Sequence, residues 1–294
     1  MTQKFDVIVG NPPYQQNSKI AKDSGTNKLW NKFIKLAIDL SPGGYVAYIT
    51  PQSFMVGNKT FDLLTSKKSI NVNTEISHYF PGINSSFSAW VLFNKDNANG
   101  ESGEMIVNGE PLDSSLGLIP KDRSHEGLSL VAKFFSKKNK FSFDRLYDHG
   151  STAIKNDPTL LGEKSKRYQH PITFTASKRG TAWSRVPSPV QGKKKVIIFR
   201  SAPIKPTYST DGVGADAFFK LVDSKEEGGN MVEIFNSKLY SYIFKTTLYS
   251  GFYSMSVFNH IPYLDYTRSW TDAEIYKHFN ITKKEQAHIE AYLG

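Results

Sequence analysis

The chain lacks cysteine altogether, since none occurs among its 294 residues. Disulfide bonds, thiolate metal ligands and a cysteine nucleophile are therefore excluded. Long hydrophobic runs are also missing, because no apolar stretch approaches the roughly 20 residues that span a bilayer. The first residues, MTQKFDVIVG, do not combine a basic stretch with a following apolar run, as a secretory signal would. We expect no membrane partner and a location in a reducing compartment, the cytoplasm.

Patterns typical of metal and nucleoside triphosphate sites are absent as well. The seven histidines are scattered along the chain and suggest no zinc site, so we expect no metal. No glycine-rich loop ends in lysine followed by serine or threonine, which a triphosphate site needs. A nuclease needs clustered carboxylates with a lysine on neighbouring strands, and Glu163-Lys164 alone does not indicate one.

Acidic residues are too few to balance the basic ones, and the excess of positive charge is concentrated in one region of the chain. The chain holds 37 Lys and Arg against 27 Asp and Glu, a net charge of +10. Residues 1–125 hold 12 basic against 11 acidic residues, residues 126–265 hold 21 against 12, and residues 266–294 hold four against four. Residues 133–205 alone carry 17 basic and four acidic side chains. Clustered cations displace counterions from a phosphate backbone, so this region favours a polyanionic partner over a merely solvated, lysine-rich surface.

Aromatic residues alternate with the basic ones in this region. Bases offer flat faces on which such rings stack, so the interleaving favours nucleic acid over a lipid surface. The candidates for contacts to bases or phosphates are Lys178, Arg179, Trp183 and Arg185, followed by the run Lys193, Lys194 and Lys195. For that run, a solvated strand edge is an equally good interpretation.

The length of 294 residues, at about 150 residues per domain, predicts about two domains. Residues 94–125 are rich in Asn, Gly, Ser and Asp, and we place the boundary there. We expect an N-terminal domain in residues 1–125, a basic domain of mixed α+β structure in residues 126–265, and a helical tail in residues 266–294.

The pattern of residues 1–95 predicts one side of an open α/β sheet. The expected elements are a buried strand at 5–9, a helix at 29–40, and strands at 45–50, 76–80 and 89–93, the last two forming a hairpin. Farther along, residues 195–200 predict a strand and residues around 231–244 a helix. In the tail, Thr271-x-x-Glu274 and Thr282-x-x-Glu285 are capping boxes and predict two short helices.

The motif that carries chemistry is Asn11-Pro12-Pro13-Tyr14, directly after the strand at 5–9 and Gly10. In open α/β sheets, ligands bind at the carboxyl ends of the strands, which is where this tetrapeptide is expected. A diproline turn that merely ends a strand is the alternative. The preceding hydrophobic strand makes the functional interpretation the stronger one.

The stretch Asp6 to Tyr14 resembles the catalytic loop of the NPPY amino-methyltransferases, and in particular the N6-adenine-specific DNA methyltransferases of restriction–modification systems. These enzymes move a methyl group from S-adenosylmethionine to a conjugated amino group. The resemblance implies that the Asn11 side-chain oxygen and the Pro12 carbonyl accept the two amino hydrogens. Pro12 and Pro13 would hold that carbonyl in one direction. Tyr14 would stack on a flipped-out base, with no covalent intermediate.

Other stretches resemble the same family in the same order. Residues 42–51 resemble its next strand, and residues 78–95 resemble the region that supplies a second aromatic ring against the extruded base. Phe80 is our candidate for that ring and Phe87 the reserve, although both also suit a core. Residues 261–265 resemble the end of the larger adenine-specific enzymes. The implied fold is a partial Rossmann-like methyltransferase sheet, containing the strands after the cofactor half, plus a mixed α+β target-recognition domain.

The same motif occurs in enzymes that methylate protein glutamine amides and in some RNA guanine methyltransferases. In those proteins it lies far along the chain, whereas here it begins at Asn11 and is followed by a long basic region. This arrangement favours double-stranded DNA as the partner. Asparagine at position 11, in place of serine or aspartate, favours adenine N6 over cytosine N4.

The family's glycine-rich loop for S-adenosylmethionine normally precedes the NPPY strand, and only four residues precede Phe5. The one glycine pair of similar appearance, in residues 211–216, follows prolines instead of a hydrophobic strand, so we interpret it as a surface turn. We therefore expect S-adenosylmethionine to be bound only with a second subunit or a missing N-terminal half. A non-catalytic DNA-binding, specificity or inhibitory protein derived from such an enzyme is the alternative.

A sheet without its first strands would present an unpaired, apolar edge beside residues 5–9. A second polypeptide, a rearranged segment of the same chain, or the remainder of a longer chain could cover that edge.

Overall fold

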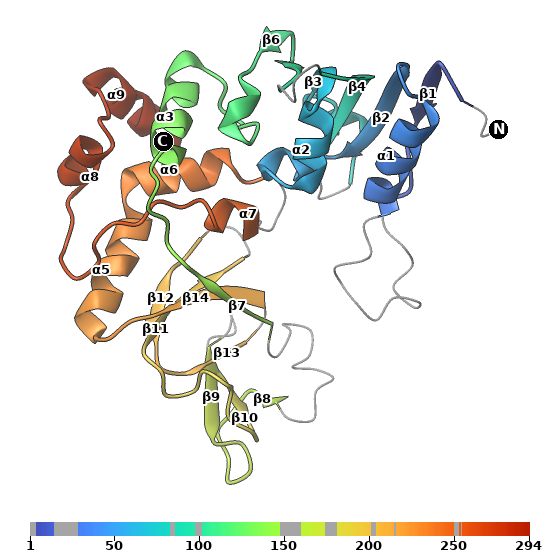
Figure 1. Cartoon of the computed structure of the whole chain (residues 1–294). Coiled ribbons are helices and arrows are strands. Elements are labelled where there is room, and N and C mark those ends of the chain that lie inside the picture. The colour runs from blue at the N-terminus through green and yellow to red at the C-terminus, as the bar shows by residue number, and fades with distance from the viewer. Residues whose placement is uncertain are drawn as a thin grey trace. The chain divides into compact units, whose positions relative to one another are not determined.

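The computed structural model describes residues 4–14, 29–82, 86–97, 102–147, 160–173, 181–200, 204–214, 216–249, 253 and 255–294. The chain divides into two compact units, Met1–Lys121 with Tyr249–Gly251, and Asp122–Leu248 with Phe252–Gly294 (Figure 1). The division after Lys121 lies within the segment 94–125. The residues that were expected to form a separate helical tail, 266–294, lie in the second unit.

The first unit is built on a six-stranded mixed sheet in the order β1-β2-β4-β3-β5-β6. Its strands are β1 Val7–Gly10, β2 Tyr45–Pro51, β3 Lys67–Asn73, β4 Phe87–Asp96, β5 Glu104–Val107 and β6 Glu110–Pro111. The pairs β1–β2 and β3–β5 are parallel, while β4 is antiparallel to both β2 and β3. The expected α/β class is thus confirmed.

The strand expected at residues 76–80 is wrong. These residues form a 3₁₀ turn, Ser77–Tyr79, and the strand lies earlier, at Lys67–Asn73. Only two of the seven residues of β3, Ile70 and Val72, are buried hydrophobics, so its apolar signal is weak. Backbone bonds from Tyr79 N to Ile76 O and from Phe80 N to Ser77 O close the turn.

Two helices lie against this sheet, α1 Leu29–Leu40 and α2 Lys59–Thr65 (Figure 1). Alternate residues of the strands, such as Val46, Trp90 and Ile70, are buried, as expected for a covered sheet face. The helix α1 buries Trp30, Ile34, Ala37 and Ile38, which recur at helical spacing. The side chain of Asn58 caps α2 by accepting from the backbone N–H groups of Thr60 and Phe61.

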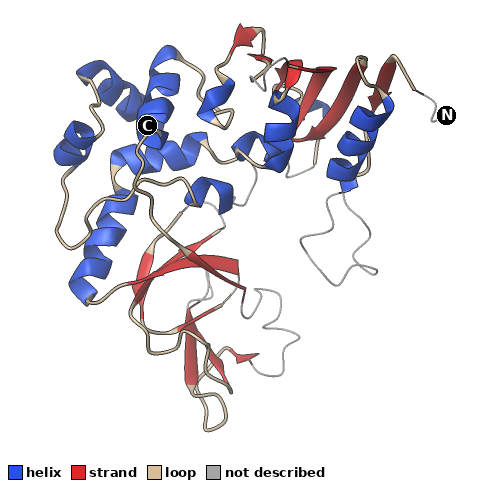
Figure 2. Cartoon of the chain, viewed as in Figure 1, coloured by secondary structure: helices blue, strands red, loops and turns tan. Residues whose placement is uncertain are grey.

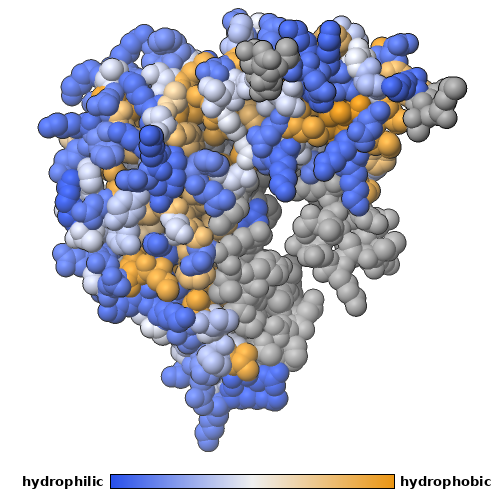
Figure 3. All heavy atoms as spheres, in the orientation of Figure 1, coloured by the Kyte–Doolittle hydropathy of each residue, from blue (hydrophilic) through white to orange (hydrophobic). Residues whose placement is uncertain are grey.

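On β1, β2 and β4 the opposite face of the sheet is apolar and exposed. Val7 is 56% exposed, Val9 75%, Tyr45 46% and Val91 47%, and register places these residues on neighbouring strands. Hydrophobic residues reach the surface in the part of the molecule that holds β1 and β2 (Figure 3). In the part of the chain that the structure describes, β1 pairs with β2 alone and forms an edge of the sheet. The unpaired apolar edge expected from the sequence is confirmed for these residues.

The second unit combines helices with two four-stranded sheets (Figure 2). Its helices are α3 His125–Phe135, α5 Lys225–Asn236, α6 Lys238–Thr246, α7 Met255–Phe258, α8 Asp272–His278 and α9 Lys283–Leu293. One sheet has the order β13-β9-β10-β8, with β8 Leu160–Leu161, β9 His170–Thr173, β10 Thr181–Ser184 and β13 Gly212–Val213. The other has the order β12-β11-β14-β7, with β7 Asp144–Tyr147, β11 Lys195–Phe199, β12 Thr207–Ser209 and β14 Asp216–Leu221.

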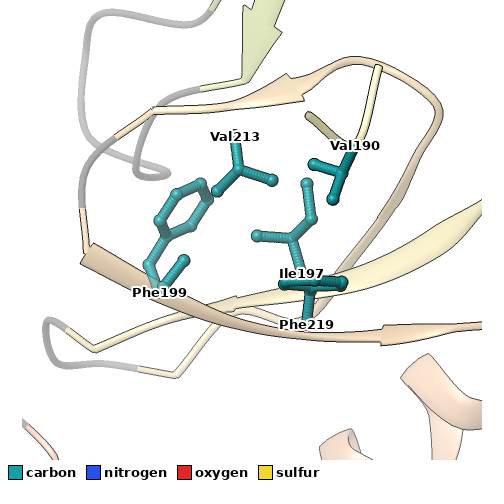
Figure 4. Packing of buried hydrophobic residues seen from close by; sticks show 6 residues of the cluster. Val190, Ile197, Phe199, Val213 and Phe219 are labelled. Carbon is teal, nitrogen blue, oxygen red and sulfur yellow. The ribbon is translucent and has the colours of Figure 1, made fainter. Parts of the chain in front are cut away.

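Apolar side chains from both sheets pack together in this unit. Figure 4 shows Val190, Ile197, Phe199, Val213 and Phe219 gathered into one cluster, all at most 7% exposed. Because Val213 belongs to one sheet and the other strand residues to the second, this cluster joins the two sheets.

The helices of the second unit agree in part with the sequence. Both capping boxes are present, at Thr271 with Glu274 and at Thr282 with Glu285, and both predicted tail helices form. The single helix expected around 231–244 is two helices, α5 and α6, because Ser237 between them has an extended backbone. Among the described helices none is both long and apolar enough to cross a membrane.

Candidate substrate site at the end of the first strand

The tetrapeptide Asn11-Pro12-Pro13-Tyr14 follows the last residue of β1 directly. It therefore lies at the carboxyl end of the parallel pair β1–β2, where open sheets bind ligands. Gly10 faces Tyr48 across the two strands, and a Cβ atom on it would lie 3.2 Å from the Tyr48 ring. Glycine thus allows the Tyr48 ring to approach the strand just before the loop.

The Tyr14 hydroxyl donates a hydrogen bond to Asn11 Oδ1, at 2.5 Å. Asn11 is exposed, Pro12 buried, Pro13 exposed and Tyr14 half-buried. Burial raises the pKa of Tyr14, and the bond to Asn11 opposes that rise in part. The phenol is therefore protonated at neutral pH and acts as the donor. This hydrogen bond closes the loop. The Tyr14 hydroxyl occupies the position in front of Asn11 Oδ1 in which a ligand N–H group could donate to that oxygen.

An aromatic wall stands beside this loop. The rings of Tyr14 and Phe87 are 5.1 Å apart and tilted by 33°, and those of Phe80 and Phe87 are 4.5 Å apart and tilted by 37°. The structure thus brings together all the expected site residues of the first unit, from three separate segments. Phe87 is only 1% exposed, so it supports the other two rings from the buried side. Phe80 is half-buried and keeps part of its ring accessible.

The buried side chain of Gln52, which was not among the predicted site residues, holds the wall in place. Its Nε2 donates to Thr74 O at 2.9 Å and to Phe87 O at 2.7 Å, and its backbone N–H donates to Ser86 O. One amide group therefore ties the end of β2 to the start of β4. The signal that could have revealed it is a polar residue placed directly after a buried strand, at Pro51-Gln52.

In the second unit, two of the expected DNA contacts form cation–π pairs. Lys164 Nζ lies 5.2 Å from the centre of the Trp183 ring, and the Arg185 guanidinium carbon lies 5.9 Å from that of Tyr168. The partners Lys164 and Tyr168 were not among the expected contacts. Lys178 and Arg179 lie outside the described residues.

Lys193 and Lys194 are exposed, but the assignment of Lys195 to a phosphate-contacting run is wrong. Lys195 is fully buried, and its Nζ donates to the carbonyl oxygens of Val190 and Lys193, both at 3.0 Å. Desolvation lowers its pKa to about 8, with Asp211 opposing the shift. The three lysines look alike in the sequence, but the third begins a strand, β11, in which every residue is buried.

The glycine pair in residues 211–216 does not fit S-adenosylmethionine. A Cβ atom on Gly212 would lie 2.4 Å from Ile172 Cδ1, 2.7 Å from Ser188 Cβ and 3.0 Å from Gln191 Oε1, so the chain's own side chains fill the space. Gly212 and Val213 form β13, a buried strand, which corrects the expected surface turn. The described residues also hold no group of three metal-ligating side chains.

Part of the chain is similar to known proteins. Residues 1–80 match the model of the family described as "Eco57I restriction-modification methylase". The chain is 30% identical over 138 residues to an "uncharacterized adenine-specific methylase" of Mycoplasma pneumoniae; this match covers 47% of the chain and 28% of the relative.

The similarity to solved structures is remote. A DrdV–DNA complex has 11% identity, covering 89% of this chain and 43% of the other, with a TM-score of 0.44. The DNA-bound ATP-dependent Type ISP restriction-modification enzyme LlaBIII has 13% identity, covering 97% and 28%, with a TM-score of 0.41. The type IIG restriction endonuclease BpuSI has 10% identity, covering 96% and 49%, with a TM-score of 0.32.

The chain thus spans 28% of the curated relative and less than half of each of these solved chains. In residues 1–80, which hold β1, the Asn11–Tyr14 loop and Phe80, it carries the pattern of the Eco57I restriction-modification methylases, in agreement with the resemblance seen in its sequence.

Proposed function

We propose that this chain is the catalytic-loop and target-recognition portion of a DNA adenine-N6 methyltransferase. The methyl group would pass from S-adenosylmethionine to an adenine flipped out of the duplex. The observation that carries this proposal is the Asn11–Tyr14 loop at the carboxyl end of β1, beside the wall of Phe80 and Phe87. The family match over residues 1–80 supports a methylase.

The loop would act on the exocyclic amine by holding both of its hydrogens. The lone pair of that nitrogen is delocalised into the purine ring, which makes it a poor nucleophile. Asn11 Oδ1 and the Pro12 carbonyl would accept the two N–H groups and favour a pyramidal nitrogen. Fixed acceptors of this kind assist a reaction because they need no rearrangement in the transition state. The Tyr14 hydroxyl now bonded to Asn11 Oδ1 would have to share that oxygen or yield it.

The rings of Tyr14 and Phe80 would hold the faces of the base. Both rings rest on buried Phe87, so stacking would not require new packing of the core. The second unit would bind the duplex, because residues 133–205 carry 17 basic against four acidic side chains. Trp183 and Arg185, with Lys193 and Lys194, are the described side chains that we assign to this contact.

We further infer that a partner supplies the cofactor site. The family's methylases use S-adenosylmethionine, but side chains of this chain already fill the space beside Gly212. Strand β1 is apolar on both faces, with Ile8 on one and Val7 and Val9 on the other, which is typical of a strand covered on both sides. A second subunit, or another part of a longer chain, would pair with this open edge.

Asn11→Ala tests the proposal. We expect methylation to fall by about 100-fold or more, because a fixed polar group at the reacting atom is lost. DNA affinity should stay within about twofold, because phosphate contacts made elsewhere provide most of it. The assay measures N6-methyladenine in mixed-sequence DNA by mass spectrometry, with the chain co-expressed with its neighbouring genes to supply the cofactor half.

Asn71→Ala, at an exposed position on β3, is the matched control and should retain full activity. Equal loss of methylation and DNA binding in folded Asn11→Ala would contradict the assignment. Salt-dependent DNA binding by the wild type without methylation in any combination would favour the non-catalytic DNA-binding protein, which the filled space beside Gly212 also favours. Indifference to DNA and to salt would favour glutamine-amide methylation.

A further inference from the structure

The 3₁₀ turn after β3 presents an aromatic pair to the surface that the proposed reaction does not use. We propose that His78 and Tyr79 form a stacking site for an unpaired nucleobase, next to the place where Asn11 holds the target base. This proposal rests on the proposed function, because nucleic acid must reach this end of the sheet.

The pair is open to a ligand. Tyr79 is 72% exposed, and its ring centre lies 3.9 Å from that of His78, with 42° between the planes. Neither residue belongs to the buried core. Two adjacent aromatic side chains, one of them largely exposed, therefore offer ring surface to a ligand.

The turn that carries the rings is firmly anchored. Tyr79 N donates to Ile76 O and Phe80 N to Ser77 O, both at 3.0 Å, and Phe87 N donates to Ser77 Oγ at 3.1 Å. Ile76 is 7% exposed and fixes the start of the turn in the core. A platform held in this way loses little conformational freedom when a ligand stacks on it.

Rings lead from the Asn11 loop toward this platform. Tyr14 contacts Phe87, Phe87 contacts Phe80, and Phe80 follows Tyr79 directly in the chain. The inner members are buried or half-buried, whereas Tyr79 is exposed. The proposed stacking site therefore begins one residue before the ring that we assign to the target base.

The chemistry of extrusion explains why a nucleobase is the fitting occupant. Removing one base from a duplex unstacks its neighbours, and that loss opposes extrusion. An aromatic side chain that accepts a neighbouring base returns part of the lost stacking, whatever the sequence, because every base has a flat face. The nearby acidic side chain of Glu75 accepts a hydrogen bond from Asn108 Nδ2, which spreads part of its charge.

Single-stranded DNA of mixed sequence is the probe, since stacking needs no recognition sequence. We expect Tyr79→Ala to weaken binding about five- to fiftyfold, while Tyr79→Phe stays within about twofold of the wild type. An oligonucleotide with scattered 2-aminopurine gives the specific readout, because stacking on an aromatic ring quenches its fluorescence. That quenching should fall in Tyr79→Ala and persist in Tyr79→Phe. Binding is measured by fluorescence anisotropy on the full chain.

Tyr45→Ala is the matched control, because Tyr45 is an exposed tyrosine in the same unit, 46% accessible, and stacks on Phe93. It should leave the affinity for DNA unchanged. Unchanged thermal unfolding of Tyr79→Ala, expected for so exposed a side chain, excludes misfolding as the cause.

The outcomes separate this inference from the proposed function. A wild-type chain that binds no DNA would overturn both. A wild-type chain that binds and quenches the probe, with Tyr79→Ala doing so equally well, would overturn only the stacking site. Loss of binding to the cofactor half, with DNA affinity unchanged, would likewise overturn it and assign the rings to a protein interface.

Discussion

Lys195 carries its ammonium group into the interior of the second unit, where two carbonyl oxygens accept its hydrogens at 3.0 Å. Desolvation lowers its pKa from 10.5 to about 8. In the unfolded chain the ordinary value returns, so the folded state binds fewer protons between these two pKa values. Folding is therefore penalised in full below about pH 8, and the penalty disappears as the pH rises toward 10.5.

Lys195→Met tests this linkage. Between pH 7 and pH 10 the free energy of unfolding of the wild type should rise, relative to the variant, by about 2 kcal/mol. Comparing the two proteins cancels the titration of all other groups. Urea unfolding at four pH values within that range measures the difference. A constant difference would show that the Lys195 amine titrates alike in the folded and unfolded states.

At the residue scale, the sequence predicted the site in the first unit better than the contacts in the second. Asn11 to Tyr14 are neighbours in the chain, so their shared position needed only one strand end to be recognised. Phe80 was predicted as a site residue only because residues 78–95 resemble the family's sequence, and the structure places its ring against that of Phe87. Lys195 could not be told from Lys193 and Lys194, because its burial depends on pairing with β14, far along the chain.

At the element scale, the start of α9 shows how one side chain can join two helices. Glu285 completes the capping box with Thr282 and also accepts from Ser129 Oγ and Lys133 Nζ of α3, both at 2.7 Å. Burial raises its pKa, but the hydrogen bonds from Lys133, Ser129 and Thr282 outweigh that effect and lower the pKa to about 2. Its stabilising effect is thus complete above the ordinary value of 4.5 and is lost as the pH falls toward 2.

We expect Glu285→Gln to lower the free energy of unfolding by about 2–3 kcal/mol at pH 7, because it removes the carboxylate that pairs with Lys133. The difference from the wild type should shrink as the pH falls from 4.5 to 2. Glu274→Gln is the matched control, since Glu274 fills the same capping position in α8 but pairs only at the surface, with Arg268. Chemical unfolding across this pH range should show a much smaller loss for that variant. Equal losses would mean that the caps alone matter.

Elements with local signals were predicted, and those that depend on distant partners were not. The two capping boxes and the strand at 195–200 rest on adjacent residues and are confirmed. Strand β3 was missed because most of its residues are polar and it is held between β4 and β5. The break between α5 and α6 occurs at Ser237, whose hydroxyl donates a hydrogen bond to Ile234 O. A single serine is not a strong sequence signal for the end of a helix.

At the scale of the whole molecule, we expect association to depend on the open edge of β1. Its outer side has no paired strand among the described residues, and Val9 is 75% exposed. Such edges pair readily with other strands, and natural proteins block them with charged side chains, lysine above all.

Val9→Lys should therefore suppress pairing at this edge while changing the free energy of unfolding by less than about 0.5 kcal/mol, because the side chain is already exposed. We expect the wild-type chain to associate with increasing concentration in sedimentation velocity, and Val9→Lys to remain monomeric. Leu221→Lys, at a 43% exposed position in the second unit, is the control and should associate like the wild type. Undiminished association of Val9→Lys would exclude β1 as the contact.

The order β1-β2-β4-β3 was beyond the reach of the sequence, because it places the fourth strand between the second and third. Hydrophobic patterns show where strands lie along the chain but not which of them pair. The exposed edge could nevertheless be predicted. The family that the sequence resembles has further strands before the strand that precedes NPPY, and only four residues precede Phe5 here.

Asn11 follows the last residue of this edge strand directly. Whatever strand joins β1 in parallel would end beside Asn11, so on our proposal assembly of the sheet and of the reaction centre is a single event. A chain without its partner would then bind DNA but not methylate it. Methylation would occur only after this chain and the cofactor half have assembled.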